Sequence, residues 1–204
     1  AAIAQKSGKF QSEIVPVTTT IKDPETDVSQ EITVSQDDGI REGVTEESLS
    51  KLTPAFGGVT TAGSASQVFD GAAAVLLMKR KTAQKLGLPF WGNMSRPRIM
   101  GVGPLYAIPA ACKKTGIDVK NVDIIELNEA FASQAVYVIE ELGLDLNKVN
   151  PLGGAIALGH PLGCTGARQI ATLLPELRRQ DKSIGLTSMC IGTGMGMAAI
   201  WERE

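Results

Sequence analysis

Strand-like and helix-like patterns alternate through the second half of the chain, and this alternation restricts the possible folds more than any other feature. Residues 122–127 (VDIIEL) have the apolar character of a buried strand, and residues 130–142 place apolar side chains at helical spacing before Gly143. Residues 184–189 are again strand-like. A strand that leads directly into a helix and is followed by another strand is typical of a sheet covered by helices. We therefore predict a layered α/β fold.

Two further helices and a last strand complete this half. Residues 106–114 favour a helix that stops at Gly116, and residues 197–201 favour a strand. Residues 167–179 also favour a helix, but Pro175 removes one hydrogen bond there, which costs about 3 kcal/mol. We expect a kink at Pro175 or two shorter helices.

The first half of the chain is less regular. Residues 1–8 predict the end of a helix closed by glycine, and residues 13–36 predict a hairpin. Residues 37–58 are polar and favour an irregular surface connection. Residues 71–78 (GAAAVLLM) form an apolar run that is either a buried strand or a short helix, since periodicity alone does not separate the two.

Composition excludes several classes of function. A net charge of −2 and a pI near 5.6 offer no basic surface for nucleic acid or an anionic membrane, and no apolar run is long enough to span a bilayer. Three cysteines and one histidine lack the spacing of a metal site, so we expect no metal. The first residues contain neither an initiator methionine nor a signal peptide, so we expect the chain to begin inside a longer protein.

His160 is the only histidine and stands between Gly159 and Pro161. A lone histidine is commonly a structural or surface residue. Here glycine permits close approach of another group and proline stiffens the turn, so the imidazole is presented from a rigid backbone. Histidine is also the side chain best suited to proton transfer near neutral pH. We predict a catalytic role for His160.

Asn128 and Cys190 each follow a predicted strand, and the carboxyl ends of strands converge on one crevice in α/β sheets. Asn128 either caps the next helix or donates to a substrate oxygen, and its motif alone leaves both open. Cys190 precedes a glycine run at 192–196 whose backbone N–H groups can face a developing oxyanion. That run precedes a strand pattern instead of a helix, so it does not fit a dinucleotide loop. Cys112 and Cys164 favour ordinary packing.

Three segments, NEAFA, GHPLGCTGAR and SMCIGTGMG, occur in this order, and with them the sequence resembles the thiolase family across essentially all 204 residues. The segment NPLGGAIALGHPLGCTGAR is most similar to sequences of the subfamily that cleaves 3-ketoacyl-CoA in peroxisomal fatty-acid β-oxidation. By this resemblance, His160 helps to generate a cysteine thiolate and, with a water held by Asn128, stabilises the thioester oxygen. Cys190 protonates the departing acetyl-CoA enolate. The N–H of Gly192 contributes to a second oxyanion hole.

The resemblance also implies a fold and partners. The family fold is a five-layered αβαβα arrangement of two similar halves with a loop domain that covers coenzyme A. Residues 1–65 correspond to the end of the loop domain, 66–91 to the last segment of the N-terminal domain and 92–204 to the C-terminal domain. Coenzyme A is a co-substrate, and no cofactor is bound permanently. The channel for its pantetheine arm is lined by Ser66, Met100 and Phe131, unless these only pack.

Expected partners are acyl-CoA, the N-terminal half of the same protein and a second copy in a homodimer. The expected location is the peroxisome, with mitochondrion or cytoplasm as alternatives.

The sequence departs from the family pattern in three places. The nucleophilic cysteine of the family lies in the N-terminal half, and none of the three cysteines here matches it, so we expect this chain alone to be inactive. Residues 89–100 are shorter than the family segment, and Ser64 stands where asparagine is usual. A noncatalytic acyl-CoA or lipid-binding protein is the alternative function. A ketosynthase-like enzyme is disfavoured, because those enzymes generally have His or Asn in place of Cys190.

Overall fold

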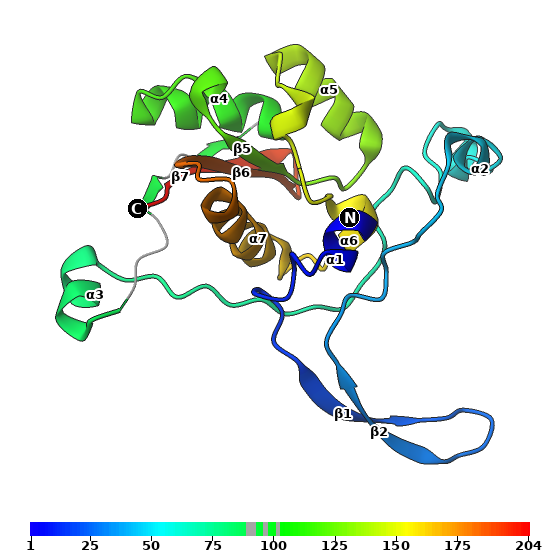
Figure 1. The fold of residues 1–204 in the computed structure, drawn as a ribbon. Helices are drawn as coiled ribbons and strands as arrows, with labels where there is room; N and C mark the ends of the chain where they lie inside the picture. Colours follow the sequence, from blue (N-terminus) through cyan, green and yellow to red (C-terminus); the bar gives the residue numbers. More distant parts are fainter. Residues whose placement is uncertain (89–92, 96–97, 101–102) are drawn as a thin grey trace.

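The computed structural model of the chain describes residues 1–88, 93–95, 98–100 and 103–204. One five-stranded sheet organises the second half (Figure 1). Its strand order is β3-β7-β6-β5, with β4 also paired to β7. The strands β5 and β6 are parallel, and β7 is antiparallel to its neighbours. Their bounds are β3 Asn93–Ser95, β4 Arg98–Met100, β5 Ile124–Leu127, β6 Ile184–Ile191 and β7 Met195–Glu202.

Helices cover both faces of this sheet, which confirms the layered α/β prediction. The helices α4 (Gly103–Thr115) and α5 (Ala132–Leu142) lie on one face, and α7 (Thr165–Arg179) lies on the other (Figure 1). In β5, Ile125 packs into the cluster that includes α4 and α5, whereas Ile124 packs against α7. All four residues of β5 are buried because the strand is covered on both sides, which explains why three of the four are apolar; the fourth is Glu126.

The helices α4 and α5 end at the predicted glycines. Gly116 and Gly143 have φ of 74° and 58°, the left-handed conformation that ends α4 and α5.

The helix α7 is a single element with Pro175 inside it, so the division into two shorter helices is wrong. Leu173 and Leu177 on either side of the proline are fully buried against the sheet. Their burial keeps both parts of the helix in one register despite the missing hydrogen bond.

The first half of the chain is extended. The helix α1 (Ala2–Lys6) ends before Gly8, and the predicted hairpin is confirmed as β1 (Val17–Lys22) paired with β2 (Ser29–Val34), which projects away from the sheet (Figure 1). The helix α2 (Glu46–Ser50) lies in a segment predicted to be irregular. Its five residues were too few to give a periodic signal, although Thr45 and Ser48 form a capping box. The helix α3 (Arg80–Leu86) follows a long extended segment.

The prediction of a buried strand or helix at residues 71–78 is wrong. This segment has no regular secondary structure, and Leu76 and Leu77 are 79% and 55% exposed. A strand requires a neighbouring strand for its hydrogen bonds, and within the described residues none pairs with this run. Short helices complete the chain: α6 (Ala155–Leu158) and the 3₁₀ turns Ala55–Gly57, Val119–Asn121 and Leu146–Lys148. The segment 89–100, which is shorter than the corresponding family segment, falls partly outside the described residues.

Candidate functional site

Asn128 and Cys190 lie at the same edge of the sheet. Leu127, the last residue of β5, is opposite Ser188 in β6, and the N–H of Asn128 donates to the Ser188 carbonyl at 2.9 Å. Cys190 is two residues further along β6. The prediction that Cys190 follows the strand is wrong. Cys190 lies inside β6, because β6 continues to Ile191 by pairing with β7. The parallel register nevertheless places both residues at the carboxyl end of the sheet.

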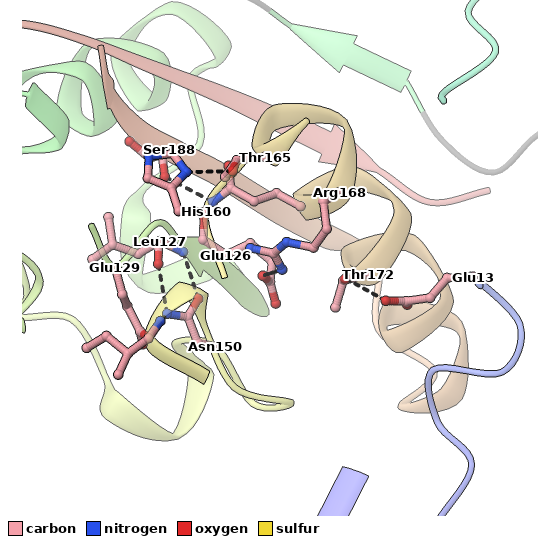
Figure 2. Close-up of polar contacts among 12 residues, drawn as sticks. Glu13, Glu126, Leu127, Glu129, Asn150, His160, Thr165, Arg168, Thr172 and Ser188 are labelled. Atoms are coloured by element: carbon pink, nitrogen blue, oxygen red, sulfur yellow. Dashed lines mark hydrogen bonds and ion pairs between the residues drawn. The ribbon is translucent and has the colours of Figure 1, made fainter. Parts of the chain in front are cut away.

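His160 contacts Asn128 directly. Its Nε2 lies 3.2 Å from Asn128 Nδ2. Its Nδ1 lies 2.6 Å from the hydroxyl of Thr165 (Figure 2). The ring follows α6 and Gly159, whose φ of 87° turns the chain toward the sheet edge. The capping interpretation of Asn128 is wrong, since α5 begins at Ala132 with Phe131 as its N-cap. The structure thus joins two predicted site residues that are 32 positions apart.

One amide atom of Asn128 is left without a partner. The side chain is 3% exposed, and its Oδ1 has no hydrogen bond within the described part of the chain. Buried polar atoms are nearly always satisfied, so an unpaired one at a suspected site is a candidate for contact with a ligand.

Glu129 and Asn150 support this pair, and the sequence interpretation did not identify either of them. The Asn150 side chain accepts from Leu127 N at 2.9 Å and donates to Leu127 O and to Glu129 Oε1, both at 2.8 Å (Figure 2). Glu129 Oε2 accepts from Ile156 N at 3.3 Å. A side chain at Gly154 would displace the Glu129 carboxylate from this position. Glu129 therefore links the end of β5 to the helix that precedes His160.

The helix α7 carries a second set of supports. Arg168 Nη1 lies 2.9 Å from Glu126 Oε2 in an ion pair that is almost fully buried (Figure 2). The Gln169 amide donates to the carbonyls of Glu126 and Ser188, at 2.8 and 3.1 Å, and so fastens β5 to β6. Burial outweighs the attraction of Arg168 and raises the pKa of Glu126 to about 7.

Burial also shifts the pKa of two neighbouring groups. It lowers the pKa of His160, and the positive charge of Arg168 lowers it further. The pKa of Glu13, which accepts from Thr172 at 2.8 Å, is raised by burial to about 7. A lowered histidine pKa favours the neutral imidazole, which is the form that accepts a proton.

The extended segment before α3 passes close to the histidine turn. The N–H of His160 faces the Gln67 carbonyl at 3.4 Å. A side chain at Gly159 would meet the ring of Phe69, and one at Gly71 would meet Pro161. Residues 67–71, here called the strap, therefore form one wall of this turn.

The remaining predicted residues are distributed as follows. Ser66 N donates to Ala130 O at 3.0 Å, and Phe131 pairs with the neighbouring Ala65, so Ser66 and Phe131 lie together beside the site. Gly192 is in the exposed loop between β6 and β7. Met100 is in β4, and its side chain lies outside the described residues.

The other two cysteines are buried packing residues, as predicted: Cys112 lies on the core side of α4, and Cys164 precedes α7.

A cavity of about 610 Å³ opens between α1, the 39–67 segment and α6. Gln67 and Ile156 are among its lining residues, whereas His160 and Cys190 are not. The cavity therefore adjoins the histidine turn without containing its imidazole.

Metal-ligating side chains do not cluster in the described part of the chain: no group of three or more His, Cys, Asp or Glu side chains there is arranged to hold a metal ion. No helix in the described ranges is long and apolar enough to cross a bilayer.

The layered fold and the His160–Asn128 pair at the sheet edge define a candidate acid–base site of an α/β enzyme class. Comparison with known families specifies this class. The profile described as "Thiolase, C-terminal domain" matches residues 89–203, and "Thiolase, N-terminal domain" matches residues 1–81. The chain belongs to the thiolase family.

Its relatives include peroxisomal enzymes. The chain is 60% identical to rat peroxisomal 3-ketoacyl-CoA thiolase B, over 99% of the chain and 50% of that protein, and 59% identical to the human peroxisomal 3-ketoacyl-CoA thiolase over the same shares. The dimeric peroxisomal thiolase of Saccharomyces cerevisiae superimposes with a TM-score of 0.88 at 53% identity, covering 100% of the chain and 51% of that structure.

Human mitochondrial 3-ketoacyl-CoA thiolase in complex with CoA gives a TM-score of 0.87 at 35% identity, again over 100% of the chain and 51% of that structure. The chain thus spans about half the length of the relatives it matches.

Proposed function

We propose that the complete protein containing this chain cleaves a 3-ketoacyl-CoA with coenzyme A, giving acetyl-CoA and an acyl-CoA shortened by two carbons. The contact between His160 and Asn128 at the sheet edge that also carries Cys190 is the observation that supports this most strongly. The names of the relatives, 3-ketoacyl-CoA thiolases, support the same substrate class.

In this proposal the chain supplies the proton-transfer and oxyanion groups. Nε2 of His160 takes the proton of a nucleophilic cysteine, and the thiolate attacks the 3-keto carbon. The bond between carbons 2 and 3 then breaks, and its electron pair passes to the departing acetyl-CoA enolate. Cys190 donates its thiol proton to carbon 2 of that enolate, which releases acetyl-CoA.

The second half-reaction returns the enzyme to its first state. Coenzyme A, deprotonated by Cys190, attacks the acyl thioester on the nucleophilic cysteine and carries the acyl group away. The released cysteine thiolate takes back the proton held by Nε2 of His160. The N–H of Gly192, in the exposed loop, is proposed to stabilise the oxyanion of this step. Asn128, with its unpaired buried Oδ1, is proposed to hold the water that serves the first oxyanion.

Ser66, Met100 and Phe131 are proposed to line the pantetheine channel. The backbone contacts that hold Ser66 and Phe131 together beside Asn128 support this for two of the three. Coenzyme A then enters as a co-substrate, in line with the CoA complex of the human mitochondrial relative.

The nucleophilic cysteine is proposed to come from an N-terminal half of the same protein. The exposed leucines of residues 71–78 support such a partner, because they would be covered by it. In this scheme residues 1–65, 66–91 and 92–204 belong to the loop, N-terminal and C-terminal domains. A homodimer in the peroxisome is proposed from the relatives' names alone.

The alternative is a noncatalytic protein that binds acyl-CoA or a lipid. Binding alone needs no proton-transfer pair, so the buried contact between His160 and Asn128 favours an enzyme.

A thiolysis assay of the complete protein with a 3-ketoacyl-CoA and coenzyme A tests the proposal. C190A is expected to lose thiolysis by about 10³-fold, because the enolate then has no proton donor. Acylation of the nucleophile from a simple acyl-CoA, followed by mass spectrometry, is expected to survive in part. C112A serves as the control, since Cys112 packs in the core away from the site. Binding of 3-ketoacyl-CoA without turnover by the native protein would favour the noncatalytic alternative.

A further inference from the structure

The side chain that contacts Nδ1 of His160 is a hydroxyl. Thr165, the first residue of α7, is 1% exposed, and its Oγ1 lies 2.6 Å from Nδ1 (Figure 2). Catalytic histidines commonly have a carboxylate or a carbonyl at this nitrogen, and the group found there decides which ring nitrogen carries the proton.

The hydrogen bonds around Thr165 favour one arrangement of protons. Its hydroxyl has a single hydrogen, which it donates to the Pro161 carbonyl at 3.0 Å, and a carbonyl can only accept. Toward Nδ1 the hydroxyl therefore presents a lone pair, so Nδ1 must carry a hydrogen and donate it.

The other side of the ring agrees with this arrangement. The amide nitrogen of Asn128, which can only donate, lies 3.2 Å from Nε2. A protonated Nε2 would oppose that donor, whereas a free lone pair accepts from it. The contacts on both sides of the imidazole therefore favour the same neutral tautomer.

We propose that Thr165 is a positioning residue that holds His160 in the neutral form with the hydrogen on Nδ1 and the lone pair on Nε2. This inference rests on the proposed function, in which Nε2 accepts the proton of the nucleophilic thiol. The contacts of Thr165 with His160 and with Pro161 lie within six residues, and Asn128 at the end of β5 completes the arrangement on the other side of the ring.

A hydroxyl and a carboxylate have different consequences for the ring. A carboxylate beside Nδ1 stabilises the charged imidazolium, whereas a neutral hydroxyl does not. Arg168 reinforces the difference, because its positive charge, which pairs with the buried Glu126, lowers the pKa of His160 after burial has lowered it. The site therefore favours the neutral imidazole, which can accept a proton. It does not stabilise the charged imidazolium that forms when the proton is accepted.

The tautomer of His160 can be measured without any turnover. Nitrogen-15 NMR of the complete protein, labelled at histidine, distinguishes a protonated ring nitrogen from a bare one, and H160N identifies which signals belong to His160. We expect a protonated Nδ1 and a bare Nε2 in the native protein. In T165V, which keeps the shape of the side chain but lacks the hydroxyl, we expect the two tautomers to mix.

The same variants should change the rate. We expect kcat/KM of T165V for thiolysis to fall about tenfold to a hundredfold, which is the range for loss of one buried hydrogen bond, with little change in KM. T165S restores the hydroxyl and should recover both the tautomer and most of the rate.

T172V is the matched control. Thr172 is equally buried on the same helix, but its hydroxyl donates to Glu13 and not to the histidine, so this variant should leave the tautomer unchanged. Thermal unfolding of all three variants verifies that each remains folded.

A native tautomer in T165V, or failure of T165S to restore it, would overturn the proposal, and so would mixed tautomers in T172V. Absence of thiolysis in the native protein would instead overturn the proposed function, and the NMR comparison would still decide the role of Thr165.

Discussion

The two parts of the chain stabilise themselves in different ways. The helix–sheet region, residues 103–204, buries its own apolar side chains: Ile108, Leu173 and Leu186 are all fully buried. The N-terminal region, residues 1–88, leaves comparable side chains in solvent, with Val68 at 102% and Leu76 at 79% exposure. Apolar side chains are therefore buried within the chain in one region and exposed to solvent in the other.

This difference teaches where a precise site can be built. His160, Asn128 and their supports all belong to the helix–sheet region, where each polar contact is held between buried elements. The N-terminal region contributes to the site through the strap and through Glu13. A rigid framework thus carries the proton-transfer groups, and an extended segment borders them.

The largest effect should come from removing the imidazole in the helix–sheet region. In the complete protein, H160A is expected to slow acylation of the nucleophile by about 10³-fold, because general base and oxyanion support are lost together. Rapid-quench measurement of the acyl-enzyme gives this rate. Acylation at the native rate would remove His160 from the mechanism and make the comparison between regions irrelevant to function.

Removing a support inside the same region should mainly lower stability. N150A takes away three hydrogen bonds to Leu127 and Glu129, and its φ of 46° is unfavourable for alanine. We expect the free energy of unfolding to fall by about 2–4 kcal/mol, measured by urea denaturation.

N147A is the control, because Asn147 bonds only to Asp145 on an exposed turn, and it should change stability by less than about 0.5 kcal/mol. Equal effects of N147A and N150A would contradict the proposed support.

The boundary between the two regions should respond to pH. The pKa of Glu13 is about 7 in the folded protein and about 4.5 when unfolded, so the folded state binds the proton more tightly between these values. The stabilising contribution of that proton is present at low pH and is lost as the pH rises through about 7. E13Q does not titrate, so we expect it to be more stable than the native protein by about 1–3 kcal/mol at pH 8, with the difference shrinking toward pH 5.

Thermal unfolding across this range provides the measurement. A stability difference that does not vary with pH would show that Glu13 has an ordinary pKa.

The smallest effect should come from the exposed part of the N-terminal region. In the chain of residues 1–204, L76A is expected to change the free energy of unfolding by less than about 0.5 kcal/mol, since Leu76 is already in solvent. L186A, at a fully buried position of β6, should cost about 2–5 kcal/mol.

A larger cost of L76A in the complete protein than in this chain would sharpen the comparison, because it would show that the leucine is covered there. Equal costs in both would argue against an N-terminal partner at this segment.

The contrast also explains what could be predicted from the sequence. The order of β5, α5, α7, β6 and β7 was readable because each element buries its apolar face against neighbours in the same stretch of chain. Residues 71–78 misled the prediction because their apolar character indicates burial, but nothing among the described residues buries them.

The site was readable only in part. Asn128, His160 and Cys190 stood out as polar or reactive residues next to strand ends and glycines. Glu129, Asn150 and Thr165 did not, because an ordinary polar residue gives no sign of its partner until the fold is known. For Glu129 the glycine at 154, 25 positions away, leaves room for the carboxylate, but this could not be assigned from one sequence.

The strap has a further consequence. Its Phe69 and Gly71 lie against Gly159 and Pro161, so the backbone on each side of the imidazole is held by residues from the more exposed part of the chain. A polypeptide in which that segment has not yet docked would have an unsupported histidine turn and hence a poorly aimed proton acceptor. The proton acceptor would then become active only when the strap docks, so a molecule that has not finished folding would not react with thioesters.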